Sequence, residues 1–191
     1  PCFTEPDESY HGIVYSKQYG KKCYLVKARM QLMRDFGVFQ SAQNAFLLDL
    51  GLQTLPLRME RHCENANTVA RFLSKQDKLA FVNYPSLEGN AYRALAQKYL
   101  PGGCSGVISF SLKGGRDAAV RFIDALKMAS NVVHVADIRT LVLHPASSTH
   151  RQLTDAQLVA AGITPGLIRL SVGCEHIDDI LEDVQQALEK A

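Results

Sequence analysis

Arg169 is the residue of this sequence whose setting points most clearly to binding chemistry. It lies in the alternating stretch 167–172, between the apolar residues Ile168 and Leu170. A guanidinium keeps its charge at any ordinary pH, so this position is costly unless an anion meets the charge. The stretch therefore predicts one of two things: a solvated arginine on an uncovered sheet face, or a clamp that binds a carboxylate or phosphate through two hydrogen bonds.

A loop rich in hydroxyl groups, residues 144–150, precedes this stretch and reads His-Pro-Ala-Ser-Ser-Thr-His. Pro145 and the three hydroxyls indicate a loop of defined shape, which favours the clamp. The spacing of His144 and His150 matches no zinc pattern, nor does the pair His62 and Cys63, so we expect no metal site.

Motifs for other chemistries are missing. The sequence has no Gly-x-Ser-x-Gly nucleophile elbow and no cysteine in a recognisable nucleophile setting. It also has no Gly-x-Gly-x-x-Gly or Walker loop, and the glycines at 114–115 are too generic to count. The residues alone thus predict one anion-binding candidate and no complete catalytic centre.

Composition limits the class of protein. The 191 residues are 47% hydrophobic, which is enough for a core, and the net charge of +2 argues against nucleic-acid binding. No apolar run reaches the roughly 18 residues that a membrane-spanning helix needs. Five cysteines without a Cys-x-x-Cys pair predict reduced, mostly buried thiols in a reducing compartment: Cys2, Cys23, Cys63, Cys104 and Cys174.

The first part of the chain differs from the rest. Residues 1–20 show neither helical nor strand periodicity, which predicts a long loop that needs a neighbour. Residues 24–36 fit a helix, and residues 44–74 fit a long helical tract that Pro56 should kink or restart.

From residue 79 onward, strands and helices follow one another. We expect helix 91–100 to turn Tyr92, Leu95, Ala96 and Tyr99 inward. Two strands each have one apolar and one polar face, so we predict an α+β domain whose mostly antiparallel or mixed sheet is covered by helices on one face. The strands are expected at 79–84, 107–112, 132–135, 141–143 and 167–172, and further helices from 115, at 154–162 and from 177, with His176 at the entry to the last.

Several motifs, in this order, resemble a known family. They are Thr-Glu-Pro-Asp-Glu-Ser-Tyr-His-Gly at 4–12, Thr-Leu-Pro-Leu-Arg-Met-Glu-Arg-His at 54–62, His-Pro-Ala-Ser at 144–147 and Arg-Leu-Ser-Val-Gly at 169–173. Over its whole length the chain resembles the C-terminal part of the O-acetylhomoserine sulfhydrylases. These belong to the cysteine/methionine-metabolism family of pyridoxal-phosphate (PLP) enzymes. The first motif favours this branch over cystathionine synthases and lyases.

The resemblance implies a fold and an activity. It implies a fold-type I enzyme, usually a cytoplasmic homotetramer, that converts O-acetylhomoserine and sulfide to homocysteine and acetate. This transferase reaction serves methionine biosynthesis and is related to transsulfuration. Residues 1–47 would be the remnant of the PLP-binding domain. Residues 48–191 would be the connecting helix and the C-terminal domain.

The resemblance also implies roles for single residues. Arg169 would clamp the α-carboxylate of the substrate, with Thr140 at the place of a serine that the family uses in the same site. The cofactor lysine of the family follows Ser-x-Thr, and no lysine here has that setting. The chain would then be a fragment that is inactive alone, does not bind PLP covalently, and depends on an upstream half.

Other interpretations stay open at this point. The parent could be an O-succinylhomoserine sulfhydrylase or a cystathionine synthase. The chain could also be a non-catalytic binding module, or one part of a split enzyme that a separate chain completes.

Overall fold

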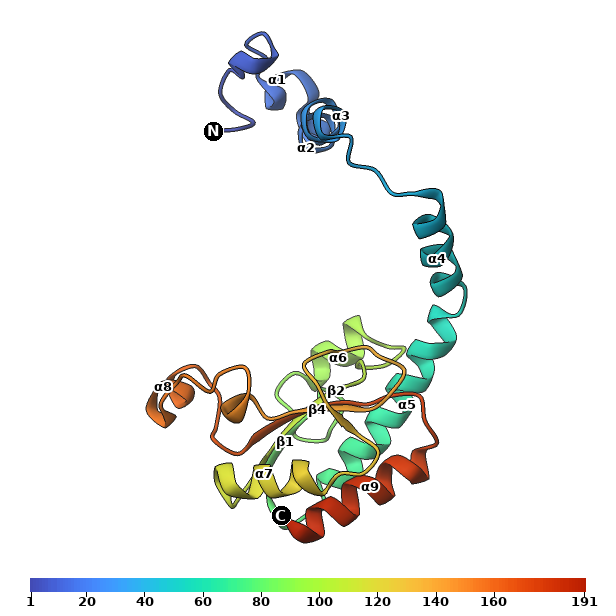
Figure 1. Cartoon of the computed structure of the whole chain (residues 1–191), viewed down its shortest axis with the longest axis vertical. Coiled ribbons are helices and arrows are strands. Elements are labelled where there is room, and N and C mark those ends of the chain that lie inside the picture. Colours follow the sequence, from blue (N-terminus) through green and yellow to red (C-terminus); the bar gives the residue numbers. More distant parts are fainter. The chain divides into compact units, whose positions relative to one another are not determined.

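The computed structural model describes all residues, 1–191, and the chain divides into two compact units, Pro1–Gln53 and Thr54–Ala191 (Figure 1). The predicted division after residue 47 concerns the function of the two parts rather than their packing, and it stays a prediction. None of the helices is both long enough and apolar enough to cross a membrane.

The first unit is a series of helical segments. Residues 23–36 form a continuous run of helical turns, which confirms the helix predicted at 24–36. The prediction that residues 1–20 lack regular structure is wrong, because a short helix there buries Tyr15 completely. The segments are η1 (Glu8–Tyr10), α1 (Tyr15–Tyr19), η2 (Gly20–Lys22), α2 (Cys23–Lys27), the π-helical η3 (Ala28–Met33), α3 (Arg34–Phe36) and α4 (Ala42–Gln53).

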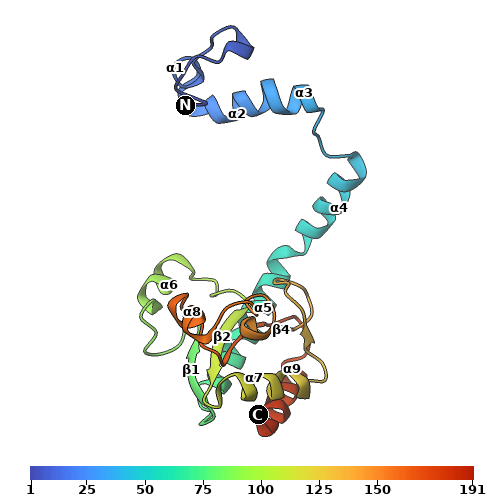
Figure 2. The same ribbon diagram turned by 60° about the vertical axis from the view of Figure 1, so that its left-hand side comes forward.

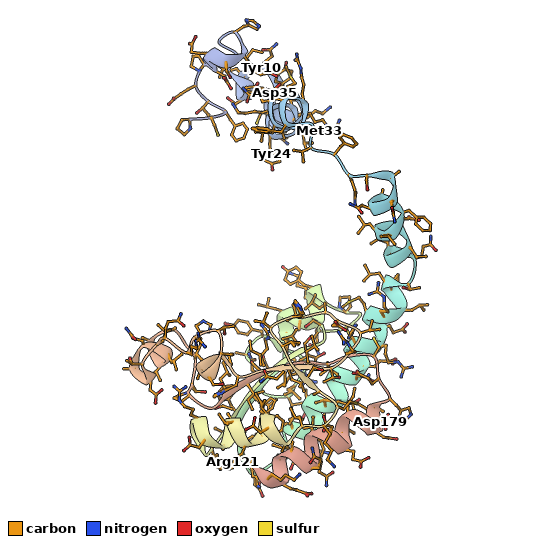
Figure 3. All side chains as sticks on the ribbon, viewed as in Figure 1. Tyr10, Tyr24, Met33, Asp35, Arg121 and Asp179 are labelled. Atoms are coloured by element: carbon orange, nitrogen blue, oxygen red, sulfur yellow. The ribbon has the colours of Figure 1, made fainter.

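Polar contacts tie the N-terminal loop to this helical run. The Asp7 carboxylate accepts hydrogen bonds from Lys27 Nζ at 2.5 Å and from Gln31 Nε2 at 2.7 Å. The Lys27 ammonium holds the pKa of the Asp7 carboxyl well below its usual range. The hydroxyl of Tyr10, labelled in Figure 3, donates to the carbonyl of Met30. The loop is therefore held by side chains of the following helix.

The second unit is built on a five-stranded sheet with the order β1-β2-β5-β4-β3. All neighbouring strands are antiparallel except β3 and β4, which are parallel. This mixed sheet confirms the predicted α+β architecture. The strands are β1 (Leu79–Asn83), β2 (Val107–Leu112), β3 (Ser130–Asn131), β4 (Leu141–Leu143) and β5 (Leu167–Ser171).

Three helices, α5 (Leu55–Leu73), α7 (Gly115–Ala125) and α9 (Ile177–Lys190), pack on one face of the sheet (Figures 1 and 2). Phe110 of β2 meets Phe122 of α7 edge-on, with ring centroids 5.7 Å apart. The exposed side chains of Arg121 and Asp179 lie on α7 and α9 (Figure 3). The predicted break in the long helical tract is also confirmed, because α5 begins at Leu55 with proline in its first turn.

The remaining helices lie outside this layer. The helix predicted at 154–162 is present as α8 (Asp155–Ala160), and a capping box of Thr154 and Gln157, a pattern that the sequence shows, opens it. The inward face predicted for α6 (Arg93–Tyr99) is wrong: Tyr92, Leu95 and Tyr99 are 66%, 52% and 66% exposed. Because α6 reaches the core only through its one small buried residue, Ala96, its larger side chains stay outside.

Two further predictions need correction. The prediction of a strand at 132–135 is wrong. Beyond Val132 the backbone pairs with no neighbouring strand and binds side chains of β5 instead. The carbonyl of Val133 accepts from Arg169, and the N–H of Ala136, just after this segment, donates to Ser171. All five cysteines are free, but only Cys104 is buried, so the expectation of mostly buried thiols is also wrong.

A buried carboxylate anchors α9 to the end of α7. Asp183 accepts the backbone N–H groups of Lys127, Met128 and Ala129 at 2.7, 3.0 and 2.9 Å. Its side chain is 6% exposed. These three bonds fix the turn that leads into β3.

Candidate functional site

Arg169 lies on the face of the sheet opposite to helices α5, α7 and α9. It is half-buried on β5, between Ser109 of β2 and Leu143 of β4, while its neighbours in the chain are in the core. Its Nη2 donates to the carbonyl of Val133 at 2.6 Å and lies 3.4 Å from that of His134. The guanidinium is therefore held in place by backbone oxygens of residues 132–140, which we call the β3–β4 loop.

One donor of this guanidinium has no acceptor. The Nε of Arg169 is buried and makes no hydrogen bond. A buried donor on a charged group without an acceptor costs free energy, and the two loop carbonyls are neutral. An anion with two oxygens would fit both the charge and the open donors of this planar group. The arrangement can bind a carboxylate.

The β3–β4 loop has a strained centre. Ala136 adopts a φ of 63°, the left-handed region that residues with a side chain avoid, and its N–H donates to Ser171 Oγ at 3.2 Å. Further along, Asp137 binds the backbone and guanidinium of Arg139, whose side chain lowers the pKa of Asp137 to about 2. The loop therefore has a defined conformation, and the left-handed backbone of Ala136 in this conformation costs free energy.

This strain leads to a prediction. Ala136→Gly is expected to raise the free energy of unfolding by about 0.5–1 kcal/mol, because glycine adopts this φ without a steric penalty. Urea denaturation of the chain measures the change. The matched control is Ala161→Gly, at an exposed position with a φ of −83°, which should lower stability instead. Equal shifts of the two variants would contradict the assignment of strain to Ala136.

Thr140 lies at the end of the β3–β4 loop and is 1% exposed. Its hydroxyl donates to Glu175 Oε2 at 2.9 Å and accepts from the N–H of Gly173 at 2.9 Å. Its own N–H donates to Glu175 Oε1 at 2.6 Å. Thr140 is thus bound to the segment after β5, while the middle of the same loop contacts Arg169. These hydrogen bonds do not include Arg169, so the part of Thr140 in a carboxylate site stays a proposal.

The segment after β5 is also held from the other side by α5. Asn65 Nδ2 donates to the carbonyls of Gly173 and Glu175 at 3.0 Å each, and His62 Nδ1 lies 2.7 Å from the carbonyl of Val172. Sequence reasoning assigned no role to these buried residues. Polar side chains at i and i+3 on the inner side of an amphipathic helix are the signal that could have found them.

The loop of residues 144–150 has a defined shape, as predicted, but its histidine is structural. His144 is 1% exposed; its Nε2 lies 2.7 Å from the carbonyl of Pro165 and its Nδ1 2.9 Å from Ser147 Oγ. An Nε2–H that donates to the carbonyl, with Nδ1 accepting from the hydroxyl, satisfies both ring nitrogens. The ring ties η4 (Pro145–Ser147) to the start of β5.

This buried ring leads to a pH prediction. Burial lowers the pKa of His144 below its usual 6.5. Below about pH 6.5 the unfolded chain therefore binds a proton that the folded chain does not, so stability is full above this pH and falls beneath it. One proton gives a slope of at most about 1.4 kcal/mol per pH unit. Urea denaturation between pH 7.5 and 5 should show a shallower loss for His144→Gln than for the wild type; parallel curves would refute this.

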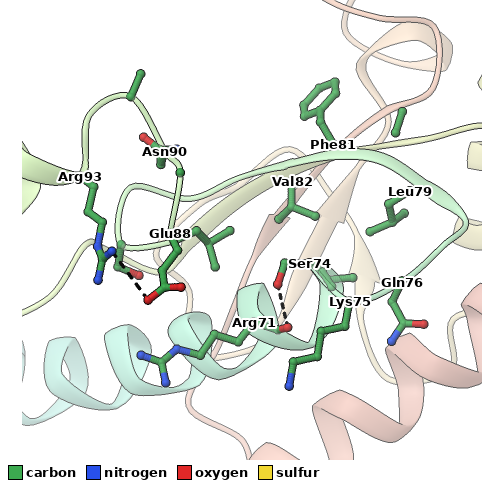
Figure 4. A pocket seen from close by; sticks show the side chains of 16 residues that line it. Arg71, Ser74, Lys75, Gln76, Leu79, Phe81, Val82, Glu88, Asn90 and Arg93 are labelled. Atoms are coloured by element: carbon green, nitrogen blue, oxygen red, sulfur yellow. Dashed lines mark hydrogen bonds and ion pairs between the residues drawn. The ribbon is translucent and has the colours of Figure 1, made fainter.

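A cavity of about 780 Å³ opens elsewhere, between the end of α5 and the edge strand β1 (Figure 4). Its charged groups include Arg71, Lys75 and Arg93, and Arg93 lies 3.8 Å from Glu88. Arg169 is not among the lining residues, and the cavity holds no nucleophile beside a base. It provides no alternative catalytic centre.

The groups near Arg169 do not form a PLP site. They are backbone carbonyls and serine hydroxyls, which suit a carboxylate held by the arginine but offer no amine for covalent attachment. Lys27 is paired with Asp7 in the first unit, and Lys78 donates to the carbonyls of Leu188 and Glu189 at the end of α9.

Comparison with known proteins gives one consistent result. Residues 8–189 match the family described as Cys/Met metabolism PLP-dependent enzyme. The chain is 47% identical over 191 residues to a homocysteine synthase of Schizosaccharomyces pombe. This match covers 100% of this chain and 44% of that protein. It is 46% identical over 195 residues to an O-acetyl-L-homoserine sulfhydrylase of Leptospira meyeri, covering 97% of this chain and 44% of that protein.

A solved structure agrees with the sequence comparison. The chain matches a protein from Campylobacter jejuni described as an O-acetylhomoserine (thiol)-lyase, which carries a pyridoxyl-lysine, with a TM-score of 0.85 and 39% identity. The match covers 98% of this chain and 44% of that one. The predicted fold of a PLP-enzyme C-terminal region is thereby confirmed, and the chain spans less than half the length of the relatives it matches. This chain belongs to the Cys/Met metabolism family of PLP-dependent enzymes.

Proposed function

We propose that this chain is the C-terminal part of a sulfhydrylase that converts O-acetylhomoserine and sulfide to homocysteine and acetate, and that it supplies the site for the substrate carboxylate. The names of the relatives support the reaction. The observation that carries the proposal is the guanidinium of Arg169, which two loop carbonyls orient while its buried Nε lacks an acceptor.

In this proposal Arg169 binds the α-carboxylate of the amino-acid substrate through paired charge-assisted hydrogen bonds. Thr140 contributes from the end of the β3–β4 loop. Holding the carboxylate fixes the direction of the amino group and of the side chain that carries the acetyl ester. This is a positioning role, which raises the rate by restricting the reactant rather than by breaking a bond. When bound, pyridoxal phosphate supplies the electron withdrawal that elimination of acetate requires.

The rest of the active site belongs to an upstream half. No lysine of this chain follows Ser-x-Thr, and the groups near Arg169 offer no amine, so we expect the chain alone to be inactive. We refer to this chain joined by an upstream half that carries the cofactor lysine as the completed enzyme. A homotetramer in the cytoplasm is the assembly and location we propose, in keeping with five free cysteines.

Co-expression tests the proposal. The chain is produced alone and together with the upstream half of a relative, and homocysteine formation is measured with O-acetylhomoserine and sulfide. Turnover is expected only with both parts, together with visible absorbance of bound cofactor. Parallel assays with O-succinylhomoserine, and with cysteine in place of sulfide, identify the donor and the nucleophile. Turnover by the chain alone, or no turnover with both parts, would contradict the proposal.

A further inference from the structure

We propose that Glu175 is a positioning residue for the carboxylate site: it fixes the β3–β4 loop and thereby sets the orientation of the Arg169 guanidinium. The proposal rests on the proposed carboxylate-binding function of Arg169 and adds the residue that keeps its guanidinium in the orientation for binding. Glu175 follows β5 and precedes α9, outside the strand that carries the arginine.

The first step is the contact between Glu175 and the loop end. Its two carboxylate oxygens accept separate hydrogen bonds from Thr140, one from the N–H at 2.6 Å and one from the hydroxyl at 2.9 Å. The Thr140 hydroxyl also accepts from the N–H of Gly173, and the N–H of Cys174 donates to the carbonyl of Ile138 at 2.7 Å. Residues 138–140 and 173–175 are thus joined by four hydrogen bonds.

The second step is the contact between the loop and Arg169. The loop leaves the sheet after Val132, whose N–H still donates to the carbonyl of Val142, and returns to it at Thr140. Between these points Arg169 binds the carbonyl of Val133, the N–H of Ala136 donates to Ser171, and the N–H of Cys174 donates to the carbonyl of Ile138 close to the return. Since Ala136 is strained, the loop needs a firm anchor at its return to keep this shape.

The third step is the rigidity of the anchor itself. Asn65 of α5 donates a hydrogen bond to the backbone carbonyl of Glu175. The backbone that carries the Glu175 carboxylate is therefore fixed in position. The Asp137 carboxylate raises the pKa of the neighbouring Arg139 guanidinium, and the Glu175 charge adds a smaller contribution in the same direction. A carboxylate is suited to this place because each oxygen can accept from a different donor of the same threonine. Glutamine has only one acceptor oxygen and would present an NH₂ group to the second donor.

The chain itself gives the first test, without cofactor. Amide hydrogen exchange is measured for the wild type, Glu175→Gln and Asp183→Asn. Asp183 is the matched control, because its carboxylate also accepts hydrogen bonds from backbone N–H groups, but at residues 127–129. Glu175→Gln should speed exchange of amides 136–140 by about tenfold or more, whereas Asp183→Asn should leave them unchanged. Unchanged exchange in Glu175→Gln, or an equal increase in the control, would overturn the proposal.

A second variant tests the same contact in case Glu175→Gln does not fold. Thr140→Val keeps the volume and the N–H bond to Glu175 but removes the hydroxyl. It should also speed exchange in the loop, though less than Glu175→Gln. Protection equal to that of the wild type would show that the carboxylate does not hold the loop through Thr140.

Kinetics of the completed enzyme give the second test. Glu175→Gln should raise KM for O-acetylhomoserine about tenfold, by a larger factor than it lowers kcat, while Asp183→Asn leaves KM unchanged. In an Arg169→Ala background the added effect of Glu175→Gln on KM should vanish, because the two residues act through one contact. Additive effects would overturn the positioning role. A wild-type KM for Arg169→Ala alone would instead refute the proposed function, and the exchange experiment separates these failures.

Discussion

Arg169→Ala in the completed enzyme is expected to lower kcat/KM for O-acetylhomoserine by about 30- to 1,000-fold, or roughly 2–4 kcal/mol. The substrate carboxylate would lose its charge-assisted hydrogen bonds and enter a half-buried site without a counter-charge. KM should rise, because the bond is present in the bound substrate, and kcat should fall as the substrate loses its orientation. Steady-state kinetics with varied O-acetylhomoserine and saturating sulfide measure both constants.

Two further variants make this result specific. Arg169→Lys keeps the charge but not the planar fork, so its kcat/KM should lie between those of the wild type and the alanine variant. Arg121→Ala removes an exposed arginine from α7, on the other face of the sheet, and should leave the kinetics as they are. A kcat/KM for Arg169→Ala equal to the wild-type value would contradict the carboxylate clamp.

Gly173→Ala should destabilise the chain by about 2–4 kcal/mol or prevent it from folding. An added Cβ would lie 2.5 Å from the carbonyl oxygen of Ile138 and from the carbonyl carbon of Arg139, and 2.2 Å from Glu175 Oε2. The two backbone atoms cannot move without breaking the bonds that join residues 138–140 to 173–175, so overpacking is costly here. Urea or thermal denaturation of the chain measures the loss.

Gly102→Ala is the matched control for this substitution. Gly102 is in the same unit, it is exposed, and an added Cβ would meet no atom within 4 Å. Its replacement should change the free energy of unfolding by less than about 0.5 kcal/mol. If Gly173→Ala proved as stable as Gly102→Ala, the close approach at the end of β5 would not be a constraint on the fold.

The strands that carry the site could be predicted because their signals are local. Alternation at 107–112 and 167–172 places Arg169 and Ser109 on the polar face, and β2 and β5 lie there side by side. The capping box at Thr154 is likewise a pattern within four residues. In contrast, the exposed aromatic residues of α6 have the helical spacing of a core face, and spacing alone does not tell which surface covers a helix.

The partners of Arg169 could not be predicted because they depend on contacts between distant parts of the chain. The carbonyls of Val133 and His134 come from a segment whose valines indicate a strand, but they accept from the side chain of Arg169 on β5 instead of from a neighbouring strand. Asn65 meets Glu175 across 110 positions of sequence. A backbone carbonyl leaves no trace in the residue type, so the motif pointed to the arginine but not to what orients it.

The central claim is that Arg169 meets the carboxylate of the substrate, and a cycle of enzyme and substrate changes tests it most directly. The completed enzyme and its Arg169→Ala variant are each assayed with O-acetylhomoserine and with the analogue whose α-carboxylate is a carboxamide. The wild type should prefer the carboxylate by about 30-fold or more in kcat/KM, and the variant should lose most of this preference. An equal preference in both proteins would show that another group binds the carboxylate and would contradict the account.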